Sequence, residues 1–315
     1  MRILKNKTHI DFLGETRRKI ALLISAIAII VSLGSLIVQE TPLEFGIDFT
    51  GGVLLEVGYP QPADIETIRS NLAAAGFEDA QVQRFGTDTD VLVRLPPQEG
   101  WNPDELREEL RRTVAGDIPN VQLRRVESVS PQVGKELAEQ GGLAMIIALL
   151  LIFVYVMVRF QWKFAAGAVA ALAHDVIVTV GFFSIFHLPF DLTVVAAVLA
   201  VIGYSLNDTV VAFDRIRENF FKLRGISAED SMNTSINEML ARTLITGFTT
   251  LFVLIALLVF GGESIAPFAI ALIVGIVVGT YSSIYTASAT ALLLGVNAQD
   301  LLEPVKDPDL IDDMP

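Results

Sequence analysis

The stretch "LTVVAAVLAVIGYSLNDTVVAFDRIRE" (residues 192–218) is apolar enough to lie in lipid up to residue 213, yet it carries Asn207 and Asp208 before that apolar part ends. A membrane-spanning helix needs about 17–25 predominantly apolar residues, so the stretch predicts one. A charged side chain at the centre of such a helix costs about 2.5–3.5 kcal/mol on insertion scales. Asp208 therefore requires a compensating partner or a function.

Five further apolar stretches have similar length. They lie at residues 20–38, 143–158, 164–186, 244–260 and 268–294. The chain has 315 residues, of which 52% are hydrophobic and 19% are charged, a balance far from that of soluble proteins. We therefore predict a polytopic α-helical membrane protein with six transmembrane helices. The first stretch follows a basic flank, as a signal peptide would, but it is too long for one and no cleavage pattern follows it.

The basic residues separate the two sides of the membrane. One side carries Arg2, Lys5, Lys7, Arg17, Arg18, Lys19, Arg159, Lys163, Arg215, Arg217, Lys222 and Arg224. The short loops on the opposite side, at 187–191 and 261–264, carry none. By the positive-inside rule we expect both termini in the cytoplasm and the long segment 40–140 outside it.

Segment 40–140 has the pattern of an α+β domain. Strand-like runs occur at 52–59, 80–86, 90–96 and 121–129, with "TDTD" (87–90) as the expected hairpin turn. Helical patterns occur at 63–77 and after Asn102 and Pro103. The order is β-α-β-β-α-β, which predicts a ferredoxin-like extracytoplasmic (periplasmic) domain between the first and second helices.

The rest of the chain divides around this domain. Residues 1–39 form the cytoplasmic N-terminus and first span, and 141–295 the remaining five spans. Ser227 and Asp230 resemble a capping box, which predicts a cytoplasmic helix near 226–241 that leads into the fifth span. Residues 296–315 are acidic and contain prolines, as solvated tails do.

Asp208 and Arg242 are expected at similar depth. Asp208 lies six residues before Asp214, which marks the cytoplasmic end of the fourth span, so it is about 9 Å inside the membrane at 1.5 Å per residue. Arg242 lies close to the cytoplasmic start of the fifth span. Two interpretations remain open. The pair is a static ion pair, with Asn207 and Ser205 as interhelical hydrogen-bond partners, or Asp208 is a proton site whose charge is controlled by Arg242.

For the other polar residues, the sequence supports less specific roles. Asp175, beside His174 in the third span, is expected to be a helper in the proton pathway or a satisfied buried acid. Asp214 and Arg215 mark the cytoplasmic interface and are expected to pair with neighbours along the helix. Gly275 and Gly279 form a GxxxG pattern, which favours close helix packing.

Several classes of chemistry lack their motifs. The sequence contains neither a GxxxxGK[ST] phosphate-binding loop nor an HExxH zinc motif, and it has no cysteine. We therefore expect no enzyme activity, no cofactor, no metal site and no nucleic-acid partner.

Four motifs together resemble the SecD/SecF family, which belongs to the resistance-nodulation-division (RND) superfamily. They are "FGIDFTGG" (45–52), "AHDVIVTVGFFSI" (173–185), "GYSLNDTVVAFDRIRE" (203–218) and "ARTLITGFTTL" (241–251). The resemblance covers nearly the whole chain. It implies that Asp208 and Arg242 match the proton-pathway acid and its basic partner, that Asp175 matches another recurrent membrane acid, and that Asp48, Gly51 and Gly52 form a structural or conformational motif. For the glycines, the plain interpretation is a turn and a strand.

The resemblance also implies a function and partners. The family uses the proton-motive force in the bacterial inner membrane to help pull secreted, unfolded chains from the SecYEG channel. This chain would pair with a second six-span unit, SecD, and YajC and YidC would be further partners. Two alternatives remain. One is half of an RND-type exporter of lipids or small molecules, and the other is a membrane scaffold that uses no energy.

Overall fold

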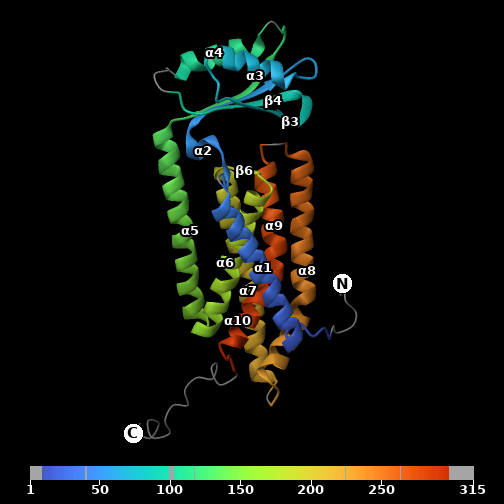
Figure 1. Ribbon diagram of the computed structural model, residues 1–315. Coiled ribbons are helices and arrows are strands. Elements are labelled where there is room, and N and C mark those ends of the chain that lie inside the picture. Colours follow the sequence, from blue (N-terminus) through green and yellow to red (C-terminus); the bar gives the residue numbers. More distant parts are fainter. Residues whose placement is uncertain are drawn as a thin grey trace, which may run out of the picture.

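The computed structural model describes residues 9–39, 41–98, 103–116, 118–223, 225–262 and 264–297. Figure 1 shows a bundle of long helices with an α+β domain over one end. Residues 1–8, Asn102 and the acidic tail beyond residue 297 lie outside the described residues.

Within the described ranges, six helical segments are long and apolar enough to cross a membrane. They are α1 (Glu15–Val38), α5 (Pro131–Arg159), α6 (Trp162–Ile185), α7 (Leu192–Lys222), α8 (Ala228–Phe260) and α9 (Ala266–Ser282), which continues through the π-helix η1 (Ser283–Ala287) into α10 (Ser288–Leu293). The predicted polytopic helical membrane protein is confirmed.

Two of these helices extend far beyond their apolar stretches. α5 begins at Pro131, where the Ser130 hydroxyl accepts a hydrogen bond from the Val133 N–H, within the segment predicted as the outer domain. α8 begins at Ala228, capped by Ser227 as the sequence predicts. The predicted cytoplasmic helix and the fifth span are therefore one helix, because a helix continues through polar turns that hydropathy does not detect.

The centre of the bundle is formed by α6, α7 and α9. Half of the residues in the apolar 18-residue segments of α6 and α7 are buried. In α5, which stands at the edge of the bundle, the share is 6% (Figure 1). A Cβ atom on Gly275 of α9 would lie 2.2 Å from a methyl group of Val201 on α7. A Cβ on Gly279 would lie 3.1 Å from Ser205. The close packing expected of the GxxxG pattern is thus present between α9 and α7.

The α+β domain contains a four-stranded antiparallel sheet and two helices. Its elements are β2 (Gly52–Gly58), α3 (Ile65–Ala74), β3 (Gln81–Phe85), β4 (Thr87–Leu95), α4 (Pro103–Ala115) and β5 (Gln122–Val129), and the strand order is β3-β4-β2-β5. Alternate side chains such as Leu55, Val57, Val91 and Val93 form the buried core with α3 and α4. Because side chains alternate along a strand, the other face of the sheet looks toward the bundle (Figure 1).

The predicted turn at "TDTD" is wrong. Residues 87–90 belong to β4, and the turn lies at Gly86, whose φ of 77° is the left-handed conformation that glycine tolerates. The Asp90 carboxylate accepts hydrogen bonds from the Thr87 hydroxyl at 2.8 Å and from the Arg124 guanidinium at 2.9 Å. These bonds allow an acidic segment to remain extended.

A small parallel strand pair, which the sequence did not predict, joins the two parts of the molecule. β1 (Glu44–Phe45) follows the first span, and β6 (Pro189–Phe190) precedes α7. The Gly46 N–H also donates to the Phe190 carbonyl at 2.9 Å. The start of the α+β domain is therefore fixed to the loop before α7.

Candidate proton-carrying site in the helical bundle

Asp208 lies on the buried face of α7. This face also carries Ser205, Thr209 and Ala212, at the three- and four-residue spacing that places side chains on one side of a helix. Only 7% of the Asp208 surface is exposed, and its buried Oδ2 has no hydrogen-bond partner in the described part of the chain. Burying a carboxylate without a hydrogen-bond partner or a counter-charge is costly, so Asp208 is unusual among the buried residues of α7.

Arg242 lies on α8, which packs against α7, and its side chain is exposed. Its charge acts electrostatically on Asp208. Within the described residues, however, no ion pair of 4.0 Å or less joins the two groups. The static ion pair considered from the sequence is therefore not present in this structure.

Asp175 differs from Asp208 because both of its carboxylate oxygens have neighbouring polar partners. It is fully buried on α6, and its Oδ2 accepts hydrogen bonds from the Ser205 hydroxyl of α7 at 2.6 Å and the Ser282 hydroxyl of α9 at 2.8 Å. The His174 Nδ1 lies 3.0 Å from the other carboxylate oxygen, Oδ1. Asp175 thus joins three helices as a well-satisfied buried acid, and Ser205 bonds to Asp175 rather than supporting Asp208.

His174 is buried beside Asp175. Its Nε2 has no hydrogen-bond partner among the described residues, and its ring lies 6.2 Å from that of Tyr281, centre to centre. The Tyr281 hydroxyl donates to the Ala21 carbonyl at 2.7 Å. The histidine therefore keeps one ring nitrogen available within a polar layer that reaches α1.

Hydroxyl groups continue this polar layer through the bundle. The Thr209 hydroxyl donates to Ser283 at 3.0 Å, and the Ser25 and Thr286 hydroxyls lie 3.1 Å apart. Ser283 and Thr286 belong to the π-helix η1, a deviation that is frequent at functional sites. The sequence interpretation missed Ser282, Ser283 and Thr286, although a cluster of hydroxyls inside the sixth apolar stretch was the available signal.

The remaining predicted residues lie toward the end of α7. Asn207 is exposed and has no hydrogen bond within the described ranges, so it does not act as the expected interhelical partner. Asp214 forms an ion pair with Arg159 at 2.8 Å. Arg215 pairs with Glu218 and Glu238.

The "FGIDFTGG" stretch forms the junction below the sheet. Gly51 and Gly52 have φ values of 73° and 116°, and Cβ atoms on them would lie 2.8 Å from Pro131 and 2.2 Å from the Leu95 carbonyl oxygen. The Asp48 carboxylate accepts a hydrogen bond of 3.0 Å from the Leu192 N–H, at the first residue of α7. The glycines thus permit a tight turn, and Asp48 connects that turn to α7.

Two family models match these regions. The model described as "Protein export membrane protein SecD/SecF, C-terminal" matches residues 109–297, which include the whole polar layer except its contribution from α1. The "SecD/SecF GG Motif" matches residues 41–63. The chain belongs to the SecD/SecF family.

Relatives within the SecD/SecF family are similar along the whole chain. The protein translocase subunit SecF of Vibrio alginolyticus is 49% identical, over 99% of both chains. The subunit of the same name from Pseudomonas aeruginosa is 47% identical, over 97% of this chain and 98% of that protein. The family resemblance seen in the sequence is therefore confirmed.

The fold also resembles solved SecDF structures. The crystal structure of SecDF from Thermus thermophilus, described as a translocon-associated membrane protein, gives a TM-score of 0.79 at 36% identity. The match covers 93% of this chain and 39% of that one. A SecDF structure in a "Super-membrane-facing form" gives a TM-score of 0.66. This chain thus corresponds to about two fifths of those longer chains.

Proposed function

We propose that this chain is an accessory subunit of the Sec protein-export machinery and that it converts proton movement across the membrane into movement of its outer domain. The observation that carries the proposal is the environment of the buried Asp208 carboxylate. One of its oxygens has no hydrogen-bond partner among the described residues, and the Arg242 guanidinium lies beyond ion-pair distance. A low-dielectric environment favours the neutral acid, whereas an approaching cation favours the carboxylate. Movement of Arg242 toward or away from Asp208 therefore couples helix position to proton binding.

The other polar residues form the rest of the proposed pathway. Asp175 is a secondary acid that holds α6, α7 and α9 together, and His174 supplies a buried ring nitrogen that has no hydrogen-bond partner among the described residues. Asn207 faces outward from α7 toward a partner, and Asp214 and Arg215 lie at the proposed cytoplasmic mouth.

The partners follow from the relatives' names and from the exposed apolar faces. The relatives are translocase subunits, and the solved SecDF chains are longer than this one. We expect SecD as the second six-helix unit, packed on an apolar face such as that of α8, with SecYEG, YajC and YidC as further partners. The substrate is an unfolded secretory polypeptide.

The orientation is part of the proposal. Basic residues on one side of the spans place both termini in the cytoplasm of a bacterial cell, with the chain in the inner membrane. The α+β domain then lies outside the cytoplasm, and its element and strand order are those of a ferredoxin-like fold.

The test is Asp208→Asn, which keeps the shape of the side chain and removes its titration. Membrane vesicles that contain the variant should assemble the complex but lose the part of export that depends on the proton gradient, and ATP-driven export should remain. Asp88→Asn is the matched control, because Asp88 is an exposed aspartate of the α+β domain that is already paired with Arg84 and lies outside the proposed pathway. If Asp208→Asn exports as well as the parent chain with the gradient present, the scaffold interpretation replaces this one.

A further inference from the structure

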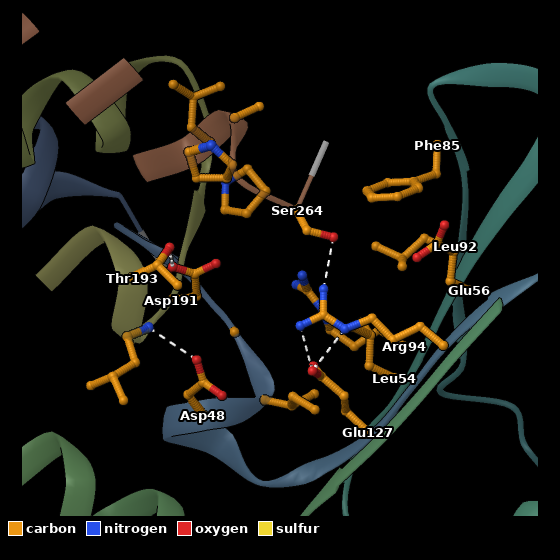
Figure 2. A pocket seen from close by; sticks show the side chains of 18 of the residues that line it. Asp48, Leu54, Glu56, Phe85, Leu92, Arg94, Glu127, Asp191, Thr193 and Ser264 are labelled. Carbon is orange, nitrogen blue, oxygen red and sulfur yellow. Dashed lines mark hydrogen bonds and ion pairs between the residues drawn. The ribbon is translucent and has the colours of Figure 1, made fainter. Parts of the chain in front are cut away.

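A cavity of about 860 Å³ lies between the sheet and the outer ends of the helices, within the size range of ligand pockets. Its ceiling is the sheet face that α3 and α4 leave uncovered, and its floor includes Leu192 of α7 and Pro267 of α9. Figure 2 shows Leu54, Leu92 and Phe85 along the sheet side of this space. Since α7 and α9 enter the apolar layer at these residues, the cavity lies at the level of lipid headgroups.

Arg94 of β4 lines this cavity without a protein partner. Within the described residues the Arg94 side chain forms neither a hydrogen bond nor an ion pair, and its Nε is buried without an acceptor. Burial lowers the pKa of the Arg94 guanidinium, while the charges of Glu44 and Asp191 raise it. A partly buried guanidinium of this kind can bind a carboxylate or a phosphate, to which its N–H groups donate hydrogen bonds.

Most acidic groups around the cavity are already engaged. Asp48 accepts from the Leu192 N–H, Asp191 accepts from the Thr193 hydroxyl and the Val194 N–H, and Glu127 pairs with Arg125. The Glu56 side chain on β2 is different, because it has no hydrogen bond or ion pair in the part of the chain that the structure describes. Among the described residues that line the cavity, Arg94 is therefore a cation and Glu56 an anion without an ion-pair partner, and Arg84 at the rim is paired with Asp88.

The two unpaired charges have a fixed relation on the sheet. Arg94 lies opposite Leu54, and Glu56 lies opposite Leu92, on neighbouring strands. They are thus diagonal neighbours about 7–8 Å apart at the backbone. Leu54 and Leu92 lie opposite them on the β2–β4 pair, while Gln81 of β3 lies on the other side of Arg94 and Arg125 of β5 lies on the other side of Glu56. A matching ligand carries a phosphate and an ammonium on a short linker, with apolar atoms attached.

We propose that this cavity binds the headgroup of an ethanolamine phospholipid from the leaflet that faces the α+β domain, with the phosphate at Arg94 and the ammonium at Glu56. The apolar ceiling and floor receive the glycerol and the first part of the acyl chains. The site does not depend on proton coupling, so it can be tested separately from Asp208.

The experiment measures lipid retained by the purified full chain after delipidation, using native mass spectrometry with phosphatidylethanolamine or phosphatidylglycerol added back. The parent chain should retain one phosphatidylethanolamine in preference to phosphatidylglycerol. Arg94→Gln should weaken retention about 10- to 100-fold, the range for loss of hydrogen bonds to a charged group. Glu56→Gln should abolish the preference between the two lipids. Arg84→Gln removes the same charge from a guanidinium that is already paired, so it should change neither result.

Three further results decide the assignment. Arg94→Lys should retain more lipid than Arg94→Gln, which separates loss of charge from misfolding. Equal retention by the parent chain and Arg94→Gln would overturn the proposal, as would equal retention of the two lipids by the parent chain. Free phosphoethanolamine lacks the apolar part and should not displace the lipid at equal concentration. Displacement would show that the site takes a soluble ligand and would overturn the lipid assignment.

Discussion

Gly275→Ala tests whether the centre of the bundle depends on the close approach of α9 and α7. The added Cβ would lie 2.2 Å and 2.7 Å from the two methyl carbons of Val201, well inside ordinary contact distance. Val201 is buried, so it cannot turn into open space. Overpacking of this kind typically costs 1–3 kcal/mol. At about 2–4 °C per kcal/mol, the melting temperature should fall by roughly 2–12 °C.

The matched control is Gly203→Ala, at a helical glycine of α7 with no atom near its added Cβ. There the better helix propensity of alanine should stabilise the chain by about 0.5–1 kcal/mol. The double variant Gly275→Ala, Val201→Ala should be less destabilised than the sum of the two single changes, because the clash is removed. Thermal unfolding in detergent, followed by circular dichroism, measures the parent chain and these four variants. Equal effects of Gly275→Ala and Gly203→Ala, or strict additivity in the double variant, would refute the reasoning.

Two further predictions concern Asp175 and the outer domain. Ser282→Ala removes one of the hydroxyls that donate to the buried Asp175, so it should lower the free energy of unfolding by about 1.5–3 kcal/mol, measured by thermal unfolding. Thr280→Ala is the control, because the Thr280 hydroxyl donates to the Ile276 carbonyl of its own helix, and its loss should cost less. Burial raises the pKa of the Tyr59 phenol from 10.0 to about 12, so its stabilising contribution should be complete below pH 10 and lost as the pH rises toward 12. Ultraviolet absorbance at increasing pH should show this late ionisation, and a midpoint near 10 would contradict the predicted burial effect.

The sequence predicts the parts of this fold that depend on local composition. Each span is recognisable because lipid requires a long apolar run, and Ser227 marks the start of α8 because its cap is formed by residues three positions away. The start of α5 at Pro131 was missed because its first turns are polar. "TDTD" was misassigned because its extended form depends on Arg124, which is distant in sequence.

The candidate site was predictable to a similar degree. An aspartate in an apolar run identifies Asp208, and helix depth brings Arg242 near it. The partners of Asp175 are not visible in the same way, because Ser205 and Ser282 reach it only through the packing of three helices. Whether Asp208 and Arg242 touch depends on side-chain conformation, which depth arguments do not determine.

The pairing of β1 with β6 gives the α+β domain a mechanical connection to the helical bundle. Backbone hydrogen bonds side by side resist being pulled apart, and Asp48 adds a further bond to the first residue of α7. Asp208 lies sixteen residues further along that helix, about 24 Å away at 1.5 Å per residue. A helix is stiff over this length, so α7 forms a rigid link between the β1–β6 pair and the carboxylate, and under the proposed function a tilt of the α+β domain changes the surroundings of Asp208 through this helix.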